Sequence, residues 1–308
     1  YILHALVFIL IFSQIVIAIQ NIQTYGFGAI RSMDLGQTTS FMLFMQWIAV
    51  PLFSVTTILG VIYYICNRKV NVIVLLALVD TATYSIMYGG RYSIFRLLFF
   101  LVFTSILFNK GGIKQYVRTN RFIILCAISI VILLSALTSM RSLSGFDFKG
   151  NIIGYYTGSI CFMDQLLKNF DPPLNYGTMT FGCIWNTINA CLKITFGKYY
   201  GSNIPYEAIT ADQLRIGNET LYNSLCTYIY PYIMDYGVNF FWIGVLFFAF
   251  IVNYIERKWN IKKQLPLLVI YIYVAYTIFN SLLMNDYLYP NFVFVVFFSF
   301  FFLKRQSI

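Results

Sequence analysis

Eight stretches of almost unbroken apolar residues run through this sequence, and their length limits what the chain can fold into. Several are about 17 to 25 residues long, the length that a helix needs to cross roughly 30 Å of hydrocarbon. The 308-residue chain is only 10% charged, whereas a soluble domain carries about 25% charged residues. A transmembrane β-barrel would show short alternating segments instead. We therefore expect an all-α, polytopic membrane protein.

The positions of the basic residues predict the topology. Twelve of the 21 Lys and Arg residues fall in four short clusters, at 68–69, 110–121, 257–263 and 304–305. Basic residues are enriched on the cytoplasmic side of membrane proteins, so the net charge of +10 reflects topology rather than nucleic-acid binding. The predicted spans then alternate correctly, with both chain ends inside, and cover residues 2–19, 41–66, 72–88, 93–108, 122–139, 238–255, 265–284 and 291–303.

A long outer loop of residues 140–237 follows from this topology. It contains two further apolar stretches, 151–167 and 179–196, which are interrupted by polar residues. We expect amphipathic helices that lie on or dip into the outer surface. Two additional crossings would preserve the topology and remain the alternative. No repeat divides the chain, so residues 1–308 are expected to form a single transmembrane domain.

Few residues in the predicted spans are ionisable or reactive. His4, the only histidine, lies near the start of the first span and is expected to be a helix-end polar residue. Asp80 lies in the third span, where an ionisable group costs about 2.5–3.5 kcal/mol. It marks a proton path, or it is held by hydrogen bonds to Thr81, Thr83 or a neighbouring helix. Four cysteines lie on the outer side, where disulfides can persist, and the sequence leaves their pairing open: Cys161, Cys183, Cys191 and Cys226.

The short cytoplasmic loops exclude chemistry that depends on a cytosolic nucleotide. They contain no G-x-x-x-x-G-K sequence and no G-x-G-x-x-G sequence after a strand. No D-x-D pair and no histidine lie on the outer side. We therefore expect no cofactor and no metal. Nine of the eleven acidic residues fall on the predicted outer side, together with several basic ones, which suits an anionic headgroup and a polar substrate.

Two motifs carry more specific information. The first is GGRYSIFRLLFFL, residues 89–101, and the second is YNSLCTYIYPYIMDYG, residues 222–237, which leads into a predicted span. Together they resemble the Wzy-type polymerases of O-antigen and capsule repeat units. Those proteins show a G-G-R corner, a long outer loop and then an N…T…P-[YF]-x-x-D-[YF]-G run, which is matched here by Asn223, Thr227, Pro231, Tyr232, Asp235, Tyr236 and Gly237.

The resemblance implies a GT-C-like helical bundle and a metal-independent glycosyltransferase of the bacterial inner membrane, with its active site on the extracytoplasmic face. Donor and acceptor would be oligosaccharides on undecaprenyl diphosphate, and the partners would be the bilayer and could include a chain-length regulator and a flippase. Family members usually have more spans than eight, so further spans are expected before Tyr1.

The same resemblance and the chemistry of diphosphate departure predict the site. Arg91 would bind the lipid-linked diphosphate through its guanidinium fork, with Gly89 and Gly90 allowing close approach; a snorkelling anchor is the alternative. Arg215 is the first choice for a second cation. The remaining predicted residues are Arg141, Asn218, Asn223 and Tyr232 at the substrate, and Glu219, Asp212 or Asp235 as base. Asp235 alternatively orients an arginine or caps the helix that begins at Gly237.

Two other functions remain open. An O-antigen ligase or related glycosyltransferase would use the same lipid carrier, although ligases of this fold rely on an outer-loop histidine that this chain lacks. A flippase or other transporter would show inverted repeats around a midplane site. Asp80 and Arg96, two ionisable residues within predicted spans, favour that reading.

Overall fold

The computed structural model is mostly helical. It describes residues 1–26, 39–88, 90, 92–109, 121, 124–125, 128–129, 132, 154–169, 174–197, 214–216, 220–222, 227–281 and 286–303. The chain divides into two compact units. Unit 1 comprises Tyr1–Phe146 and Phe298–Leu303, and unit 2 comprises Asp147–Phe297 and Lys304–Ile308. The single transmembrane domain stays a prediction.

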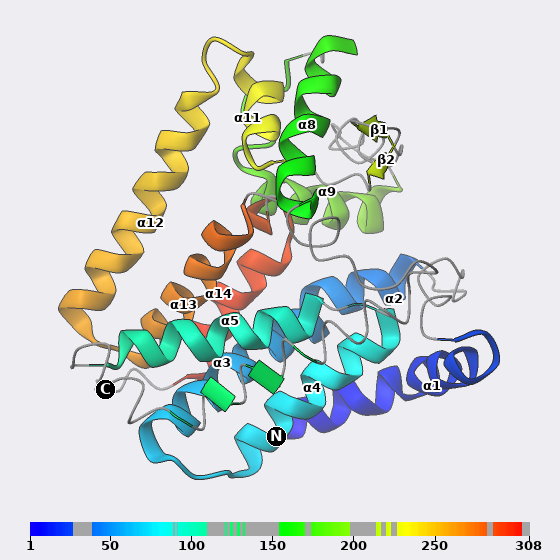
Figure 1. The fold of residues 1–308 in the computed structure, drawn as a ribbon, viewed down its shortest axis with the longest axis vertical. Helices are drawn as coiled ribbons and strands as arrows, with labels where there is room; N and C mark the ends of the chain where they lie inside the picture. The colour runs from blue at the N-terminus through cyan, green and yellow to red at the C-terminus, as the bar shows by residue number, and fades with distance from the viewer. Residues whose placement is uncertain are drawn as a thin grey trace. The chain divides into compact units, whose positions relative to one another are not determined.

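Unit 1 is a bundle of apolar helices in which α1 lies along α4, and α3 packs against both α4 and α5 (Figure 1). The described elements are α1 (Ile2–Tyr25), α2 (Thr39–Phe44), the π-helix η2 (Met45–Ala49), α3 (Val50–Asn67), α4 (Val72–Tyr88) and α5 (Tyr92–Leu107).

The helix from Ser40 to Asn67 forms the core of unit 1. In its most apolar 18 residues 78% are buried, against 22% in α1. A Cβ atom at Gly60 would lie 2.7 Å from the Cβ of Ala77, so a glycine is needed where α3 and α4 approach each other. Because α1 is apolar all round yet mostly exposed, it presents an apolar surface that water solvates poorly.

The π-helical turn in this helix has a local cause. Pro51 lies at the start of α3 and has no N–H to donate to the turn before it. The five residues of η2 immediately precede α3, and a wider turn at this point keeps the helix continuous through the missing bond.

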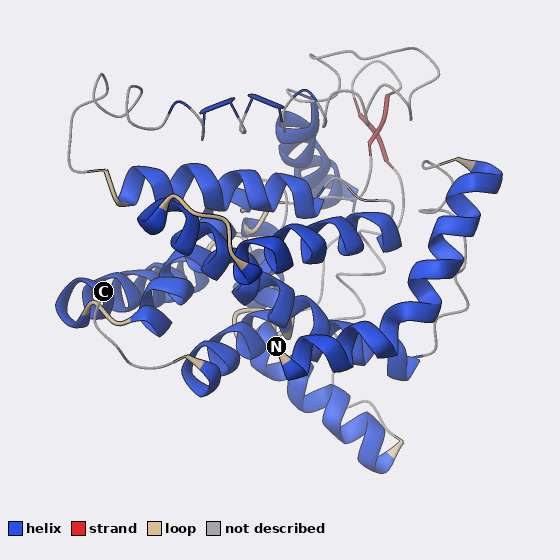
Figure 2. Ribbon diagram, turned by 90° about the horizontal axis from the view of Figure 1, so that it is seen from below, coloured by secondary structure: helices blue, strands red, loops and turns tan. Residues whose placement is uncertain are grey.

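Unit 2 contains longer connections and the only described strands, which form an antiparallel pair (Figure 2). Its described elements are α8 (Gly154–Asn169), α9 (Gly182–Phe196), β1 (Leu214–Ile216), β2 (Thr220–Tyr222), α11 (Ile229–Tyr236), α12 (Trp242–Lys262), α13 (Leu265–Asn280), η4 (Asp286–Leu288) and α14 (Asn291–Phe302), whose last five residues group with unit 1.

One hydrophobic cluster of unit 2 joins α8, α11 and η4. Its buried side chains are Phe162, Leu166, Met179, Tyr230, Met234 and Leu288. A Cβ atom at Gly182 would lie 2.8 Å from Leu288 Cδ2 and 3.1 Å from its Cα, so α9 packs on η4 at a glycine. Asn186 of α9 donates a hydrogen bond of 2.8 Å to the Leu288 carbonyl and fixes the same contact.

Each predicted span that the structure describes contains a helix, although residues 238–241 of the predicted span 238–255 form a turn before α12. Two, Ile2–Tyr25 and Ser40–Asn67, are long and apolar enough to cross a bilayer, and the shorter apolar helices are α4, α5, α13 and α14. The two stretches predicted as amphipathic helices correspond to α8 and α9. Most of the predicted span 122–139 lies outside the described residues. The β1–β2 pair was not predicted.

Candidate functional site

The glycine corner between α4 and α5 is held by its own backbone and by a serine. Gly90 N donates to the Ser85 carbonyl at 3.1 Å, and the Ser85 hydroxyl donates to the Gly90 carbonyl. The Ser93 hydroxyl of α5 donates to the Thr81 carbonyl of α4 at 3.0 Å. These bonds join α4 to Gly90 and to the first turn of α5. Gly89 and Arg91 lie outside the described residues.

Replacing Gly90 with alanine is expected to leave the fold intact. A Cβ atom there would lie 3.8 Å from the Tyr88 carbonyl oxygen and 4.0 Å from Tyr92 N, which are ordinary contacts. We expect the free energy of unfolding to change by less than about 0.5 kcal/mol, as is usual for a substitution that creates no clash and removes no specific contact. Membrane abundance and thermal unfolding of Gly90→Ala against wild type measure this. A clear fall in either would contradict it, whereas lost activity at normal abundance would indicate a ligand close to the backbone.

Most of the predicted outer-loop residues cannot be placed. Arg215 is in the middle of β1, paired with Leu221 of β2. Residues 217–219, which include Asn218 and Glu219, connect these two strands in the chain. The remaining predicted residues that lie outside the described part are Arg141, Asp212, Asn218, Glu219 and Asn223.

Asp235 has a well-defined environment at the end of α11. One carboxylate oxygen accepts a hydrogen bond from Met179 N at 3.0 Å. The other accepts from Thr180 N and, at 2.7 Å, from the Thr180 hydroxyl. Asn175 N also donates to the Met234 carbonyl, at 2.8 Å. Asp235 therefore ties the turn before α9 to α11, two segments about 55 residues apart in the chain.

This geometry bears on both roles proposed for Asp235. The residue is 1% exposed, and both oxygens are occupied by donors. Burial raises the pKa of its carboxyl above the usual range, while hydrogen bonds from Met179, Thr180 and Gly177 act in the opposite direction. The expected cap on the helix after Gly237 is wrong, because α12 begins at Trp242 and has no side-chain cap. The side chain instead orders the turn that leads into α9.

Tyr232, a predicted substrate residue, is fully buried. Its ring packs directly against Gly244 of α12, where a Cβ atom would overlap the ring. Gly237 ends α11 with φ +76°, a conformation that glycine adopts without strain. The motif in residues 227–237 therefore builds a compact link between the turn before α9 and the start of α12.

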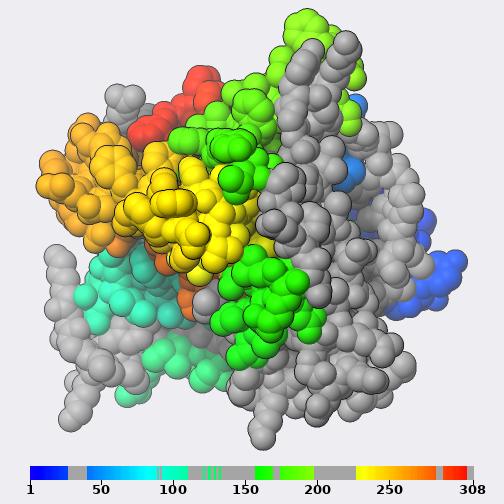
Figure 3. Space-filling view, turned by 90° about the horizontal axis from the view of Figure 1, so that it is seen from above, coloured from blue at the N-terminus to red at the C-terminus, as the bar shows by residue number. Residues whose placement is uncertain are grey.

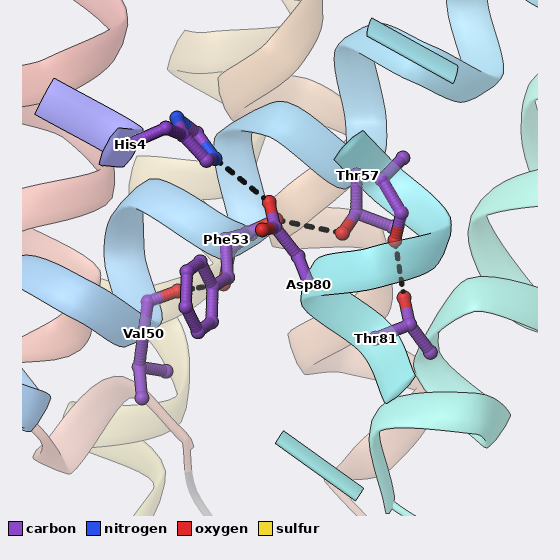
Figure 4. A network of polar contacts seen from close by, with 8 residues as sticks. His4, Val50, Phe53, Thr57, Asp80 and Thr81 are labelled. Carbon is purple, nitrogen blue, oxygen red and sulfur yellow. Dashed lines mark hydrogen bonds and ion pairs between the residues drawn. The ribbon is translucent and has the colours of Figure 1, made fainter. Parts of the chain in front are cut away.

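A buried polar cluster lies in unit 1, where His4 of α1 and Asp80 of α4 point toward each other (Figure 4). His4 Nε2 is 2.9 Å from Asp80 Oδ2, and the two residues are 6% and 0% exposed. His4 lies in the first turn of α1, as predicted, and it also pairs with an acid on another helix, which was not predicted. Of the hydrogen-bond partners predicted for Asp80, the one observed is a residue of a neighbouring helix, His4. The Thr81 hydroxyl donates instead to the Ala77 carbonyl.

Arg96 of α5 adds a third ionisable group to this cluster. It is 5% exposed, interacts electrostatically with Asp80, and its guanidinium lies 5.8 Å from the centre of the Tyr84 ring. Asp80 Oδ1 and Arg96 Nε have no hydrogen-bond partner among the described residues. Buried polar atoms of this kind are usually satisfied by water or by a ligand.

The cluster can hold or pass a proton, but it cannot touch a large substrate in this conformation. An ionised carboxylate only accepts hydrogen bonds, so Nε2 carries the hydrogen when Asp80 is charged. The rings of Phe8 and Phe53 lie 6.3 Å and 6.2 Å from the imidazole and surround it with apolar surface. Ionisable residues within apolar helices tend to pair with one another, and this tendency is the signal that would have linked His4 to Asp80.

Of the four cysteines predicted on the outer side, the three that the structure describes are free thiols. Cys161 and Cys191 are exposed and Cys183 is buried, while Cys226 lies outside the described residues. Burial raises the pKa of Cys183 to about 11, although a hydrogen bond with Tyr287 acts in the opposite direction. Cys183 is therefore protonated at neutral pH and a poor nucleophile. No group of three or more His, Cys, Asp or Glu side chains suited to a metal occurs in the described part of the chain.

Comparisons with models of protein families, with curated proteins and with solved structures found no match to this chain.

Proposed function

We propose that the protein is a membrane-embedded glycosyltransferase that joins oligosaccharide repeat units carried on undecaprenyl diphosphate. The observation that carries the proposal is the pair of motifs, in the order and spacing of Wzy-type polymerases. Two further observations support it. Helix α1 is apolar and mostly exposed, as expected of a helix in lipid. The second motif forms a buried link directly before α12.

The proposed reaction divides the predicted residues into three roles. The sugar hydroxyl of one repeat unit attacks the anomeric carbon of the donor, and the bond to the lipid diphosphate breaks. Arg91 and Arg215 stabilise the negative charge that develops on the diphosphate. Glu219 or Asp212 accepts the hydroxyl proton. Asp235 acts as a positioning residue, since its oxygens already accept hydrogen bonds from the turn before α9.

Arg91→Lys tests the role of the guanidinium fork. Lysine keeps the charge but loses paired hydrogen bonding, and a charge-assisted bond contributes about 1.5–3 kcal/mol. We expect polymerisation of lipid-linked units by the purified protein to slow by roughly one to two orders of magnitude. Arg215→Lys should behave similarly.

The matched control is Arg121→Lys, the same change at an exposed helical position in a basic cluster. It should leave the rate unchanged. If both Arg91→Lys and Arg215→Lys polymerise at the wild-type rate and at normal membrane abundance, Arg91 is a snorkelling anchor and the site assignment is wrong.

In cells, deletion of the protein should leave single repeat units on the outer leaflet.

A proton-coupled carrier of lipid-linked oligosaccharides is the second candidate, because of the buried His4–Asp80 pair and Arg96. Reconstituted vesicles with an imposed pH gradient separate the two functions. A carrier would move lipid-linked units between leaflets in response to the gradient, without lengthening them. Its deletion would trap units in the cytoplasmic leaflet.

A further inference from the structure

Helix α9 has two chemically different faces. One face is buried against unit 2: Cys183 and Asn189 are 2% and 1% exposed, and Asn186 bonds to the Leu288 carbonyl. The other face is exposed and mostly apolar, with one exposed polar side chain, Thr195, whose hydroxyl donates to the Cys191 carbonyl. Its members, with the preceding Phe181, are Phe181 (43% exposed), Ile184 (48%), Ile188 (44%), Ile194 (63%), Phe196 (64%) and the exposed thiol Cys191. We call this set the α9 stripe.

Helix α8 in the same unit exposes charged side chains as well as apolar ones. Its exposed side includes Thr157, Ile160 (49% exposed) and Cys161 and ends in an ion pair between Asp164 and Lys168, with Nζ 2.7 Å from Oδ2. Both partners of that pair are well exposed, at 59% and 69% of their side-chain surface. Figure 3 shows yellow-green atoms from the part of the chain that contains α9 at the surface of unit 2. The exposed side chains of α9 are therefore mostly apolar, whereas those of α8 include an ion pair.

We propose that the α9 stripe lies in the bilayer, at the boundary between headgroups and acyl chains of the outer leaflet. Ile184, Ile188 and Cys191 follow one another at helical spacing, so they can enter lipid together. In the same unit, α12 also exposes apolar side chains, Leu246 at 60% and Phe250 at 67%.

Bilayer lipid is the occupant that these observations favour. A water-facing α9 would expose four large apolar side chains on the helix and Phe181 directly before it, whereas α8 exposes one, Ile160, beside an exposed ion pair. The inference rests on the membrane assignment within the proposed function, but not on the chemistry of sugar transfer. It adds that α9, and not α8, anchors the outer loop to the membrane.

The two native thiols allow a direct test. Two variants of the full chain keep either Cys191 or Cys161, with the other five cysteines replaced by serine. Each is labelled with an environment-sensitive maleimide dye after reconstitution into bilayers. We expect blue-shifted emission at Cys191 and severalfold stronger quenching by lipids that carry a nitroxide on the upper acyl chain. The dye on Cys161 should instead be quenched by aqueous iodide.

A third probe separates the possible failures. Leu6, 52% exposed on α1, is changed to cysteine in the cysteine-free background and labelled in the same way. Quenching of this probe by lipid nitroxide, without quenching at Cys191, would overturn the α9 inference and keep the membrane assignment. If neither probe is quenched by lipid, the membrane assignment itself fails. If instead the dye on Cys191 becomes less accessible to iodide as the protein concentration rises, a second copy of the chain covers the α9 stripe.

Discussion

Replacement of Asp80 with leucine is expected to destabilise the protein by about 3–5 kcal/mol, the usual cost of removing one partner of a buried charged pair. Arg96, 5% exposed, would then keep its charge in the bundle without the carboxylate that compensates it. His4 would lose its hydrogen bond at the same time. The measurement is the free energy of unfolding of the purified protein in one detergent.

The double variant Asp80→Leu/Arg96→Leu is expected to recover most of this loss. Replacing both charged partners with apolar side chains removes the uncompensated charge, and such exchanges are often neutral. Only the imidazole N–H of His4 remains unpaired, at about 1–3 kcal/mol. Arg121→Leu removes a cation at an exposed position and should have little effect. Additive losses from Asp80→Leu and Arg96→Leu would show that the two residues do not compensate each other.

The activity of the double variant distinguishes the two candidate functions. Asp80 is 0% exposed and cannot reach an oligosaccharide, so a polymerase should keep its activity once the fold is restored. A carrier driven by protons needs an ionisable group in this place. A stable double variant that no longer responds to a pH gradient would favour the carrier.

The helices were predictable because apolar runs are local. The segment predicted at 41–66 is helical from Ser40 to Asn67. Errors arose where polar residues ended an apolar run but not the helix: α1 continues through Gln20 and Asn21 to Tyr25, and α12 continues through charged residues to Lys262. Hydropathy reports where a helix leaves an apolar environment, whereas backbone hydrogen bonds determine where it ends.

The polar contacts were not predictable in the same way. His4 and Asp80 are 76 positions apart, and Asp235 and Thr180 are 55 apart. The period of an apolar pattern gives the face of a helix, but not the helix that packs against it. Asp235 was predicted to be important because it belongs to a motif, and Asp80 because it lies in the middle of a predicted span. It did not supply Thr180 or His4 as their partners, because a short polar side chain near a turn or a helix end has many possible roles.

Asp235→Ala is the second change with a large expected effect, about 3 kcal/mol of destabilisation. Two backbone N–H groups and the Thr180 hydroxyl lose their acceptor, and each unsatisfied buried group costs about 1–3 kcal/mol. Relief of the carboxylate's own burial offsets part of this loss, since burial raises the pKa of that carboxyl. Asp235→Asn keeps one acceptor oxygen and should have an intermediate effect. Thermal unfolding in one detergent ranks the three proteins.

The matched control is Asp164→Ala, which removes a carboxylate from the exposed ion pair with Lys168 on α8. Exposed pairs contribute about 0–1 kcal/mol, so this variant should unfold nearly as wild type does. If Asp235→Ala were as stable as Asp164→Ala yet inactive, Asp235 would act on the substrate directly and not through the turn before α9. If instead Asp235→Asn recovers activity in proportion to stability, the carboxylate serves to position that turn, because a base cannot be replaced by an amide while a hydrogen-bond acceptor can.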